Sequence, residues 1–413
     1  MKSRLMVLCA LLLVAGLTTA SAEGPVVPRE RTPLWNGKDF TGWKLFLDDP
    51  DADAKTVWSV KDEVVRCEGE PAGYMRTETD YGNYRLHVEW RWPEGAGNSG
   101  VLLHMSGEDK VWPKSIEAQL YSENAGDFWL IDGTVIKDRD GKPNEERRVP
   151  KKKESSENPL GEWNMYDIVC KGKTIRVFVN GMLQNEAAET SVTSGKICLQ
   201  SEGKPIEFRN VYIDPLPEPV HLKNKTPLWN GKDFSGWKLV LEDPEVDVKT
   251  VWSVKDGVIH CTGVPNGYMR TEKDYADYKL HVEWRWAAEP SNSGVLLHAT
   301  GPDKVWPRCV EAQLAAGNAG DLILMDWADV KERAGSRRGF FGRVAKREDS
   351  SEKAPGEWNA YDIICKGDTI RLYVNGVLQN EATESTETAG KICLQSEGNA
   401  IEFRNVYIEP LEQ

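Results

Sequence analysis

Apolar and polar side chains alternate strictly along 85–92, where Leu86, Val88 and Trp90 fall on one side of the chain. A period of two is typical of a β-strand with one buried face. Further short runs of this kind follow, at 174–179, 182–184, 196–200 and 206–213. Between the first two of them, Asn180-Gly181 favours the positive φ angles of a tight hairpin turn. The pattern therefore predicts strands and short turns, with no convincing amphipathic helix.

The whole pattern occurs twice along the chain. Residues 32–40 recur as 226–234, and the register then holds, with one slip of a single residue, as far as Asn210 and Asn405. A period this long indicates duplicated domains rather than a solenoid. We expect a first domain at 31–216, a short proline-rich linker at 217–224 and a second domain at 225–412. Many short strands with glycine-rich turns predict an all-β fold, with one antiparallel two-sheet sandwich in each domain.

The N-terminus indicates a cleavable signal peptide. Lys2 and Arg4 precede an apolar run over 5–17 that is too short to span a bilayer, and Ala20-Ser21-Ala22 follows it. Residues 1–22 are therefore predicted to be removed, which leaves a secreted or periplasmic protein. No membrane span is expected later in the chain. The formal net charge of -13 predicts no general attraction to nucleic acid.

Cysteines recur in both repeats. Export to an oxidising compartment permits disulfides, and Cys170 with Cys198 is the candidate pair in the first domain. Both lie in apolar strand-like runs, however, so buried free thiols are the alternative. No Cys-x-x-Cys spacing occurs, and a structural zinc site is therefore not expected.

The polar sides of three predicted strands, at 85–92, 100–104 and 116–119, form the candidate site. If these strands share one sheet, a single open face gathers two histidines, two carboxylates, an arginine and an amide. These residues are His87, Glu89, Arg91, His104, Glu117 and Gln119 in the first domain, and His281, Glu283, Arg285, His298, Glu311 and Gln313 in the second. Such a set suits acid/base chemistry or the binding of a sugar. The alternative is a cross-strand ion pair of Glu89 with Arg91 beside a solvated histidine.

Two tryptophans of each repeat lie in loop-like sequence, while most others fall on predicted core faces. They are Trp112 and Trp163 in the first domain, and Trp306 and Trp358 in the second. An exposed indole ring can stack on a sugar ring, so these residues are candidates for substrate binding.

Both repeats contain the same ordered series of short motifs. In the first they are 34–43, Glu89-Trp90-Arg91, Asn98-Ser99-Gly100, Glu117-Ala118-Gln119, 161–164, Asn180-Gly181, 195–200 and Phe208-Arg209-Asn210. The series resembles the 3-keto-disaccharide hydrolase domain family, over nearly all of the chain after residue 30. The resemblance implies two tandem concanavalin A-like jelly-roll β-sandwiches, similar to family 16 glucanases. It also implies action on glycosides oxidised at C3.

The implied chemistry begins with removal of the C2 proton, which the C3 ketone acidifies. The resemblance then makes His104 or Glu117 the base. Arg91 stabilises the enolate, with His87 or a divalent metal ion as an additional partner, and Glu89 orients Arg91. A non-catalytic, lectin-like pair of carbohydrate-binding modules is the alternative, since tandem copies bind with avidity.

The chain departs from the family pattern at two positions in each repeat. His104 and His298 stand where the family often has arginine, and Tyr121 and Ala315 stand where it usually has aspartate. The repeats also differ most from each other over 128–159 and 322–355. We expect loops at the rim of the site there, and therefore different ligands for the two domains, or one working domain and one that only binds.

Overall fold

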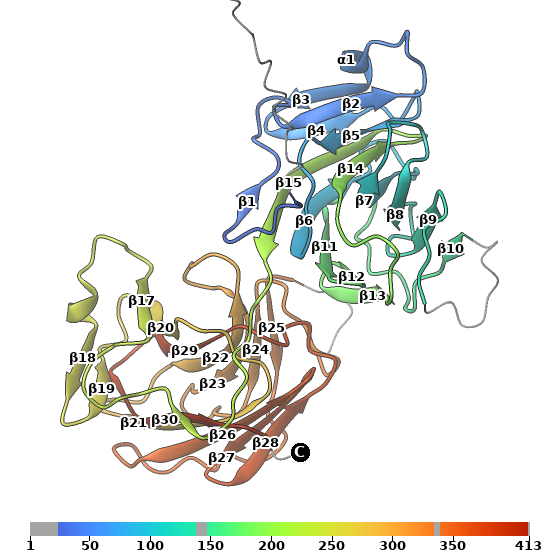
Figure 1. The fold of residues 1–413 in the computed structure, drawn as a ribbon. Coiled ribbons are helices and arrows are strands. Elements are labelled where there is room, and N and C mark those ends of the chain that lie inside the picture. Colours follow the sequence, from blue (N-terminus) through green and yellow to red (C-terminus); the bar gives the residue numbers. More distant parts are fainter. Residues whose placement is uncertain (1–23, 138–146, 334–338, 412–413) are drawn as a thin grey trace, which may run out of the picture.

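Two β-sandwiches follow one another along the chain (Figure 1). The computed structural model describes residues 24–137, 147–333 and 339–411. The predicted signal peptide, 1–22, lies outside these residues. Strands make up nearly all of the regular structure, beside a short helix α1 (Ala54–Val57) and a 3-10 turn η1 (Val248–Thr250). The prediction of two all-β sandwich domains is confirmed. No helix of the described residues is long and apolar enough to cross a membrane.

The first domain packs an eight-stranded sheet against a seven-stranded one. In order across the sheet, the larger one contains β13 (Met182–Ala187), β12 (Thr174–Val179), β11 (Asn164–Lys171), β6 (Tyr84–Arg91), β15 (Ile206–Pro215), β4 (Val64–Cys67) and β3 (Trp58–Lys61), with β1 (Thr32–Pro33) paired to β15. The smaller one contains β10 (Arg148–Val149), β9 (Phe128–Ile131), β8 (Lys114–Gln119), β7 (Gly100–Ser106), β14 (Lys196–Ser201), β5 (Gly73–Thr77) and β2 (Trp43–Leu47).

The second domain repeats this topology strand for strand. Its eight-stranded sheet contains β28 (Val377–Ala382), β27 (Thr369–Val374), β26 (Asn359–Lys366), β21 (Tyr278–Trp286), β30 (Ile401–Glu409), β19 (Val258–Cys261) and β18 (Trp252–Lys255), with β16 (Thr226–Pro227) paired to β30. Its seven-stranded sheet contains β25 (Phe341–Val344), β24 (Leu322–Met325), β23 (Arg308–Gln313), β22 (Gly294–Thr300), β29 (Lys391–Ser396), β20 (Gly267–Thr271) and β17 (Trp237–Leu241).

The core of each sandwich lies between its two sheets. On β6, the alternating residues Leu86, Val88 and Trp90 are fully buried in it, as the period of two predicts. The predicted hairpin is also confirmed, because β12 pairs with β13 and the turn residues Asn180 and Gly181 have φ angles of 48° and 81°.

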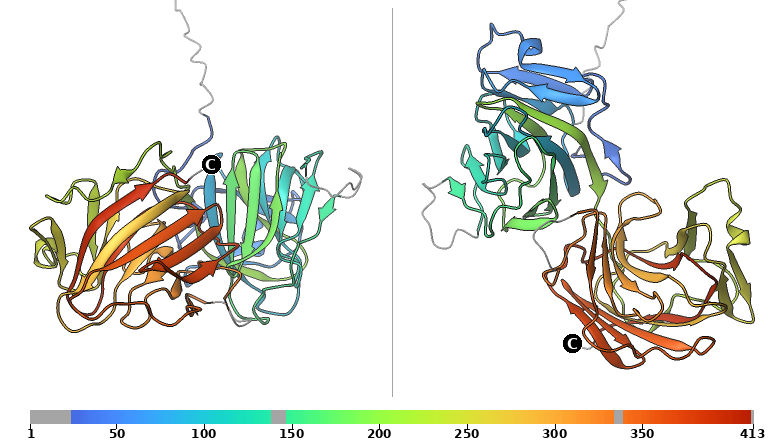
Figure 2. Two further views of the ribbon diagram at one scale, coloured as in Figure 1. Left: turned by 90° about the horizontal axis from the view of Figure 1, so that it is seen from below. Right: turned by 180° about the vertical axis from the view of Figure 1, so that it is seen from behind.

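The chain passes from the first sandwich to the second through the linker between β15 and β16 (Figure 2). Ion pairs join the two domains. The guanidinium of Arg308 donates to Asp167 and to Glu387, each over 2.6 Å. Arg85 of the first domain also donates to Glu387, over 3.1 Å. The linker is anchored to the second domain, because the backbone N–H of Glu218 donates to a carboxylate oxygen of Asp274.

The described cysteines are all buried free thiols. Cys170 lies on β11 in the core of the sandwich, whereas Cys198 lies on β14 and belongs to a separate apolar cluster on the other side of that strand's sheet. The candidate disulfide between them is therefore not formed, and the alternative of buried thiols is the correct one.

Candidate functional site

The predicted site residues are divided between the two sheets of each sandwich. β6, which carries His87, Glu89 and Arg91, lies in the eight-stranded sheet between β11 and β15. β7 and β8, which carry His104 and Glu117, lie in the seven-stranded sheet. The two sheets pack through their inner faces, so their outer faces point in opposite directions. The expectation that one open face gathers all six residues is therefore wrong, in both domains.

Paired charges cover the outer face of the eight-stranded sheet. Nε of Arg91 donates to Glu207, and Nε of Arg209 donates to Glu89, each over 2.6 Å. Trp163 lies against both arginines, whose guanidinium carbons are 4.7 and 4.0 Å from its ring centroid. Each of these charges has a partner, and the indole is held by cation–π contacts. The ion-pair alternative therefore describes this face, although the pairs run between neighbouring strands and do not join Glu89 to Arg91.

His87 belongs to the same face. Its Nδ1 lies 3.0 Å from Oδ1 of Asp167, and its ring stacks on Tyr212 with 4.6 Å between centroids. Burial alone would lower the pKa of His87, but the carboxylates of Asp167 and Glu89 raise it to about 9. The imidazole is therefore a cation at neutral pH, paired with its carboxylate neighbours.

The second domain repeats this arrangement with its own residues. They are Arg285 with Glu402, Arg404 with Glu283, Trp358 against both arginines, and His281 at 2.9 Å from Asp362. The candidates on this face are therefore engaged structurally in both copies.

His104 is turned into the interior by a β-bulge. The pairing of β7 with β8 shifts between Leu103 and Ser106, and His104 has a φ angle of +55° there. Its ring meets the core residue Tyr84 edge-on, 5.7 Å between centroids, and burial lowers the pKa of His104 to about 4. His298 has the same position in the second domain, 5.5 Å from Tyr278. Simple alternation predicts these histidines on the open face, and the bulge makes this prediction wrong.

Glu117 lies on the outer face of the seven-stranded sheet, since its neighbours Ile116 and Ala118 belong to the core. Only 4% of Glu117 is exposed, and its Oε1 has no hydrogen-bond partner among the described residues. Burial raises the pKa of Glu117 to about 8, and the nearby charge of Glu202 adds to the rise. A carboxyl group with a pKa near neutrality and a free oxygen is equipped for proton transfer.

Gly100 makes room for this carboxyl group. It is one of the residues on β7 that face outward, and a Cβ atom there would collide with Oε1 of Glu117. The same collision would occur between Gly294 and Glu311. The Asn-Ser-Gly motif therefore requires glycine at its third position, because the carboxylate lies too close to the backbone to leave room for a Cβ atom.

Gln119 adds a fixed donor beside Glu117 on β8. Its Oε1 accepts hydrogen bonds from the backbone N–H groups of Leu120 and Tyr121, over 2.8 and 2.7 Å. Because the oxygen is held in this way, the amide Nε2 is the end that remains as a donor. Gln313 is oriented identically in the second domain, by Leu314 and Ala315.

Three further polar residues belong to this region, and strand alternation at 85–92, 100–104 and 116–119 does not identify them. They are Asn98, Gln200 and Glu202. Oδ1 of Asn98 and Oε1 of Gln200 are buried without a partner among the described residues. Burial raises the pKa of Glu202, although a hydrogen bond from Asn98 opposes the rise. The parity of the strand at 196–200, with Ile197 and Leu199 inward, could have identified Gln200.

The second domain retains the whole outer-face set. It comprises Glu311, Gln313, Asn292, Gln395 and Glu397, with buried oxygens that lack partners among the described residues on Glu311, Asn292 and Gln395. Burial raises the pKa of Glu311 well above its ordinary range, and the charge of Glu397 contributes.

An ion cluster borders this face in the first domain. Asp109, in the loop between β7 and β8, accepts from Arg76 over 2.7 Å and from the hydroxyl of Tyr74 over 3.1 Å. Arg76 holds the pKa of Asp109 far below its usual range. Trp112 follows in the same loop and is 43% exposed, so its indole ring stands at the rim of the seven-stranded sheet.

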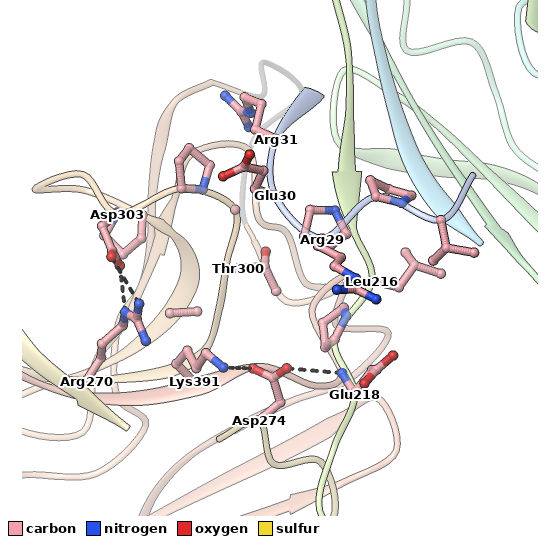
Figure 3. Close-up of a pocket in the computed structure, with 18 of the residues that line it drawn as sticks. Arg29, Glu30, Arg31, Leu216, Glu218, Arg270, Asp274, Thr300, Asp303 and Lys391 are labelled. Atoms are coloured by element: carbon pink, nitrogen blue, oxygen red, sulfur yellow. Dashed lines mark hydrogen bonds and ion pairs between the residues drawn. The ribbon is translucent and has the colours of Figure 1, made fainter. Parts of the chain in front are cut away.

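A cavity of about 1390 Å³ lies at the domain junction (Figure 3). One wall is the second domain's seven-stranded sheet, including Arg270 and Lys391, and the other is formed by Pro25, residues 27–31 and residues 215–218. A row of directly paired residues runs across four strands of this sheet, from Arg270 over Cys393 and Leu296 to Glu311. Glu311 itself does not line the cavity, but the outer face that carries it continues there.

A metal site is not formed by the described residues. No group of three or more histidine, cysteine, aspartate or glutamate side chains within them is arranged to hold a metal ion.

Two jelly-roll sandwiches, each with a buried carboxyl group on the outer face of its smaller sheet, define a tandem concanavalin A-like protein. The chain belongs to the family described as the 3-keto-alpha-glucoside-1,2-lyase-like domain, whose sequence model matches residues 30–214 and 224–409. This membership places the chain among carbohydrate-active proteins, and it confirms the resemblance in both copies.

Three similar solved structures each cover less than half of the chain. A protein named as a glycosyl hydrolase of Parabacteroides distasonis ATCC 8503 is 25% identical with a TM-score of 0.34, over 47% of this chain and 99% of its own. The Bacillus licheniformis beta-glucanase is 15% identical with a TM-score of 0.32, over 45% and 98%. The carbohydrate-binding module CBM66 of Bacillus subtilis is 12% identical with a TM-score of 0.32, over 42% and 95%. No curated protein matches the chain.

Proposed function

We propose that this protein is a secreted enzyme that cleaves 3-keto-glycosides by elimination, with net hydrolysis when water adds afterwards. The family membership supports the substrate class. The observation that carries the proposal is the buried carboxyl group of Glu117, with its unpartnered oxygen and raised pKa, on an outer sheet face that both domains retain. Removal of a proton next to a ketone requires such a base.

The reaction proceeds in two steps. A base takes the C2 proton, and the electron pair of the broken C–H bond forms the enolate, with its negative charge on the C3 oxygen. The enolate then collapses, a C1=C2 double bond forms, and the C1–O bond breaks as the leaving oxygen takes a proton. Addition of water across C1 and C2 restores the sugar ring and completes the hydrolysis.

Glu117 takes the role of base in this proposal, and it acts in its ionised form, whose population grows as the pH rises toward its pKa of about 8. Its strand neighbour Gln119 offers Nε2 as a hydrogen-bond donor to the developing enolate oxygen, which is the form of stabilisation that a preorganised donor supplies. Glu202, whose pKa is also raised, supplies a proton to the leaving oxygen. His104 and Arg91 receive no role, because the first lies in the core and the second is paired on the opposite sheet.

The test is turnover of 3-keto-trehalose and 3-keto-sucrose, measured as released reducing sugar. We expect turnover by the wild type and a loss of at least about a hundredfold in the Glu117→Gln/Glu311→Gln double variant, since general-base catalysis contributes on that scale. His104→Asn is the matched control, because asparagine tolerates the left-handed backbone there and the histidine has no role. Binding of these sugars without turnover would reject the enzyme and leave the lectin-like alternative.

Secretion is the second part of the proposal. The basic residues, the short apolar run and the Ala20-Ser21-Ala22 box support it. N-terminal sequencing of the protein from its native source should begin at Glu23. A chain that begins at Met1 would reject the signal peptide.

A further inference from the structure

Trp129 stands directly beside Glu117 on the same outer face. β8 and β9 pair so that Glu117 and Trp129 lie opposite each other. The neighbours Phe128 and Leu130 belong to the core, so the indole ring of Trp129 points away from it, and the residue is half-buried. An aromatic side chain on β9 is therefore the cross-strand neighbour of Glu117.

The second domain lacks this surface. Ile323 lies opposite Glu311 in the same register. The flanking residues are retained, because Arg148 pairs with Trp129 and Arg343 pairs with Ile323 on the next strand. The replacement of tryptophan by isoleucine is therefore confined to this position, since the glutamate and the arginine on the two neighbouring strands are retained.

The tryptophan at the rim of the sheet is also packed differently in the two domains. Trp306 is half-buried and packs against the apolar cluster that contains Cys309 and Met325, and Ile323 packs against the same cluster. Its ring meets Phe341 edge-on, 6.0 Å between centroids. Trp112, its counterpart, is 43% exposed. An aliphatic residue, Ile323, therefore lies opposite Glu311, whereas an aromatic one, Trp129, lies opposite Glu117.

We infer that Trp129 is the stacking platform that holds a pyranose ring against Glu117, and that the first domain is consequently the one that turns over small 3-keto-disaccharides. The apolar face of a pyranose stacks on indole, and the neighbouring carboxyl group then faces the ring substituents. The second domain, with Ile323, binds such a ring weakly. This inference rests on the proposed function for its substrate class.

Reciprocal exchange of the two residues tests the inference in the full-length chain. Glu311→Gln leaves the first domain as the working site, and Glu117→Gln leaves the second. In the first background, Trp129→Ile should raise KM for 3-keto-trehalose by about three- to tenfold with little change in kcat, because an aromatic contact contributes on that scale. In the second, Ile323→Trp should lower KM. Isoleucine already occupies this strand position in the second domain, so the first exchange preserves the fold, which a thermal melt verifies.

Binding separates this inference from the proposed function. Titration of trehalose, which is not oxidised and does not react, is followed by isothermal calorimetry in the same variants. Binding that weakens in Trp129→Ile but not in Trp163→Ala, on the opposite sheet, supports the platform even if no 3-keto-disaccharide is cleaved. Equal KM and equal affinity in Trp129→Ile and its parent overturn the inference, whether or not the wild type is an enzyme.

Discussion

Arg308 of the second domain donates a hydrogen bond to Asp167 of the first over 2.6 Å, at a junction where both side chains are nearly inaccessible. The equivalent residues of the other repeats, Lys114 and Asp362, do not form this contact. Lys114 occupies the position of Arg308 in the first domain and is exposed. Asp362, the counterpart of Asp167, has a side chain that is 28% exposed instead of 4%. The domain contact is therefore formed by Arg308, which replaces the lysine of the first repeat, and by an aspartate that both repeats contain.

Removal of Arg308 should destabilise the protein. Arg308→Ala leaves Asp167 and Glu387 buried without this partner, and breaking a buried pair in this way lowers the free energy of unfolding by about 3–5 kcal/mol. Urea unfolding measures the change. Lys114→Ala is the matched control and should change little, since the residue is exposed. Equal unfolding curves for Arg308→Ala and the wild type would show that the junction does not contribute to stability.

Glu117 should make stability depend on pH. Its pKa is raised from 4.5 to about 8 in the folded state, so the folded protein keeps a proton that the unfolded chain releases. The stabilising contribution is therefore complete below pH about 4.5 and is lost as the pH rises through about 8. Glu117→Gln/Glu311→Gln should become more stable relative to the wild type between pH 5 and pH 9. Chemical unfolding at both pH values measures this difference, and a constant difference would contradict the raised pKa.

Gly100→Ala should displace the carboxyl group of Glu117. The added methyl group collides with Oε1, which costs about 1–3 kcal/mol of stability if the side chain cannot move aside. Turnover of 3-keto-disaccharides should fall with it. Gly339→Ala is the control, because a Cβ atom there meets nothing within 4 Å. Unchanged turnover and stability in Gly100→Ala would mean that Glu117 is not confined by the backbone.

The cysteines should react only after unfolding. Burial raises the pKa of Cys170 to about 12, and the described cysteines are free. A thiol reagent should therefore label the native protein very slowly and should titrate seven thiols per mature chain in denaturant without reductant. Fewer thiols under these conditions would reveal a disulfide that the structure does not contain.

The strand pattern predicted much of the fold, because it depends on neighbours along the chain. Alternation identified the buried side of β6, and Asn180-Gly181 located a hairpin, since each turn needs specific φ angles. The repeat gave two domains, and the ordered motifs gave the family. Glu117 and Gln119 were also correctly placed together, because residues two apart on one strand share a face.

The tertiary structure alone decided which strands share a sheet. β6 and β7 are consecutive in sequence, yet they pair in different layers, so His87 and Glu117 point to opposite sides of the sandwich. A one-residue bulge turned His104 inward, and no local pattern announces such an insertion. Sequence determines the two sides of each strand through the geometry of neighbouring residues, whereas hydrogen bonds between distant segments determine the face of the protein on which each side lies.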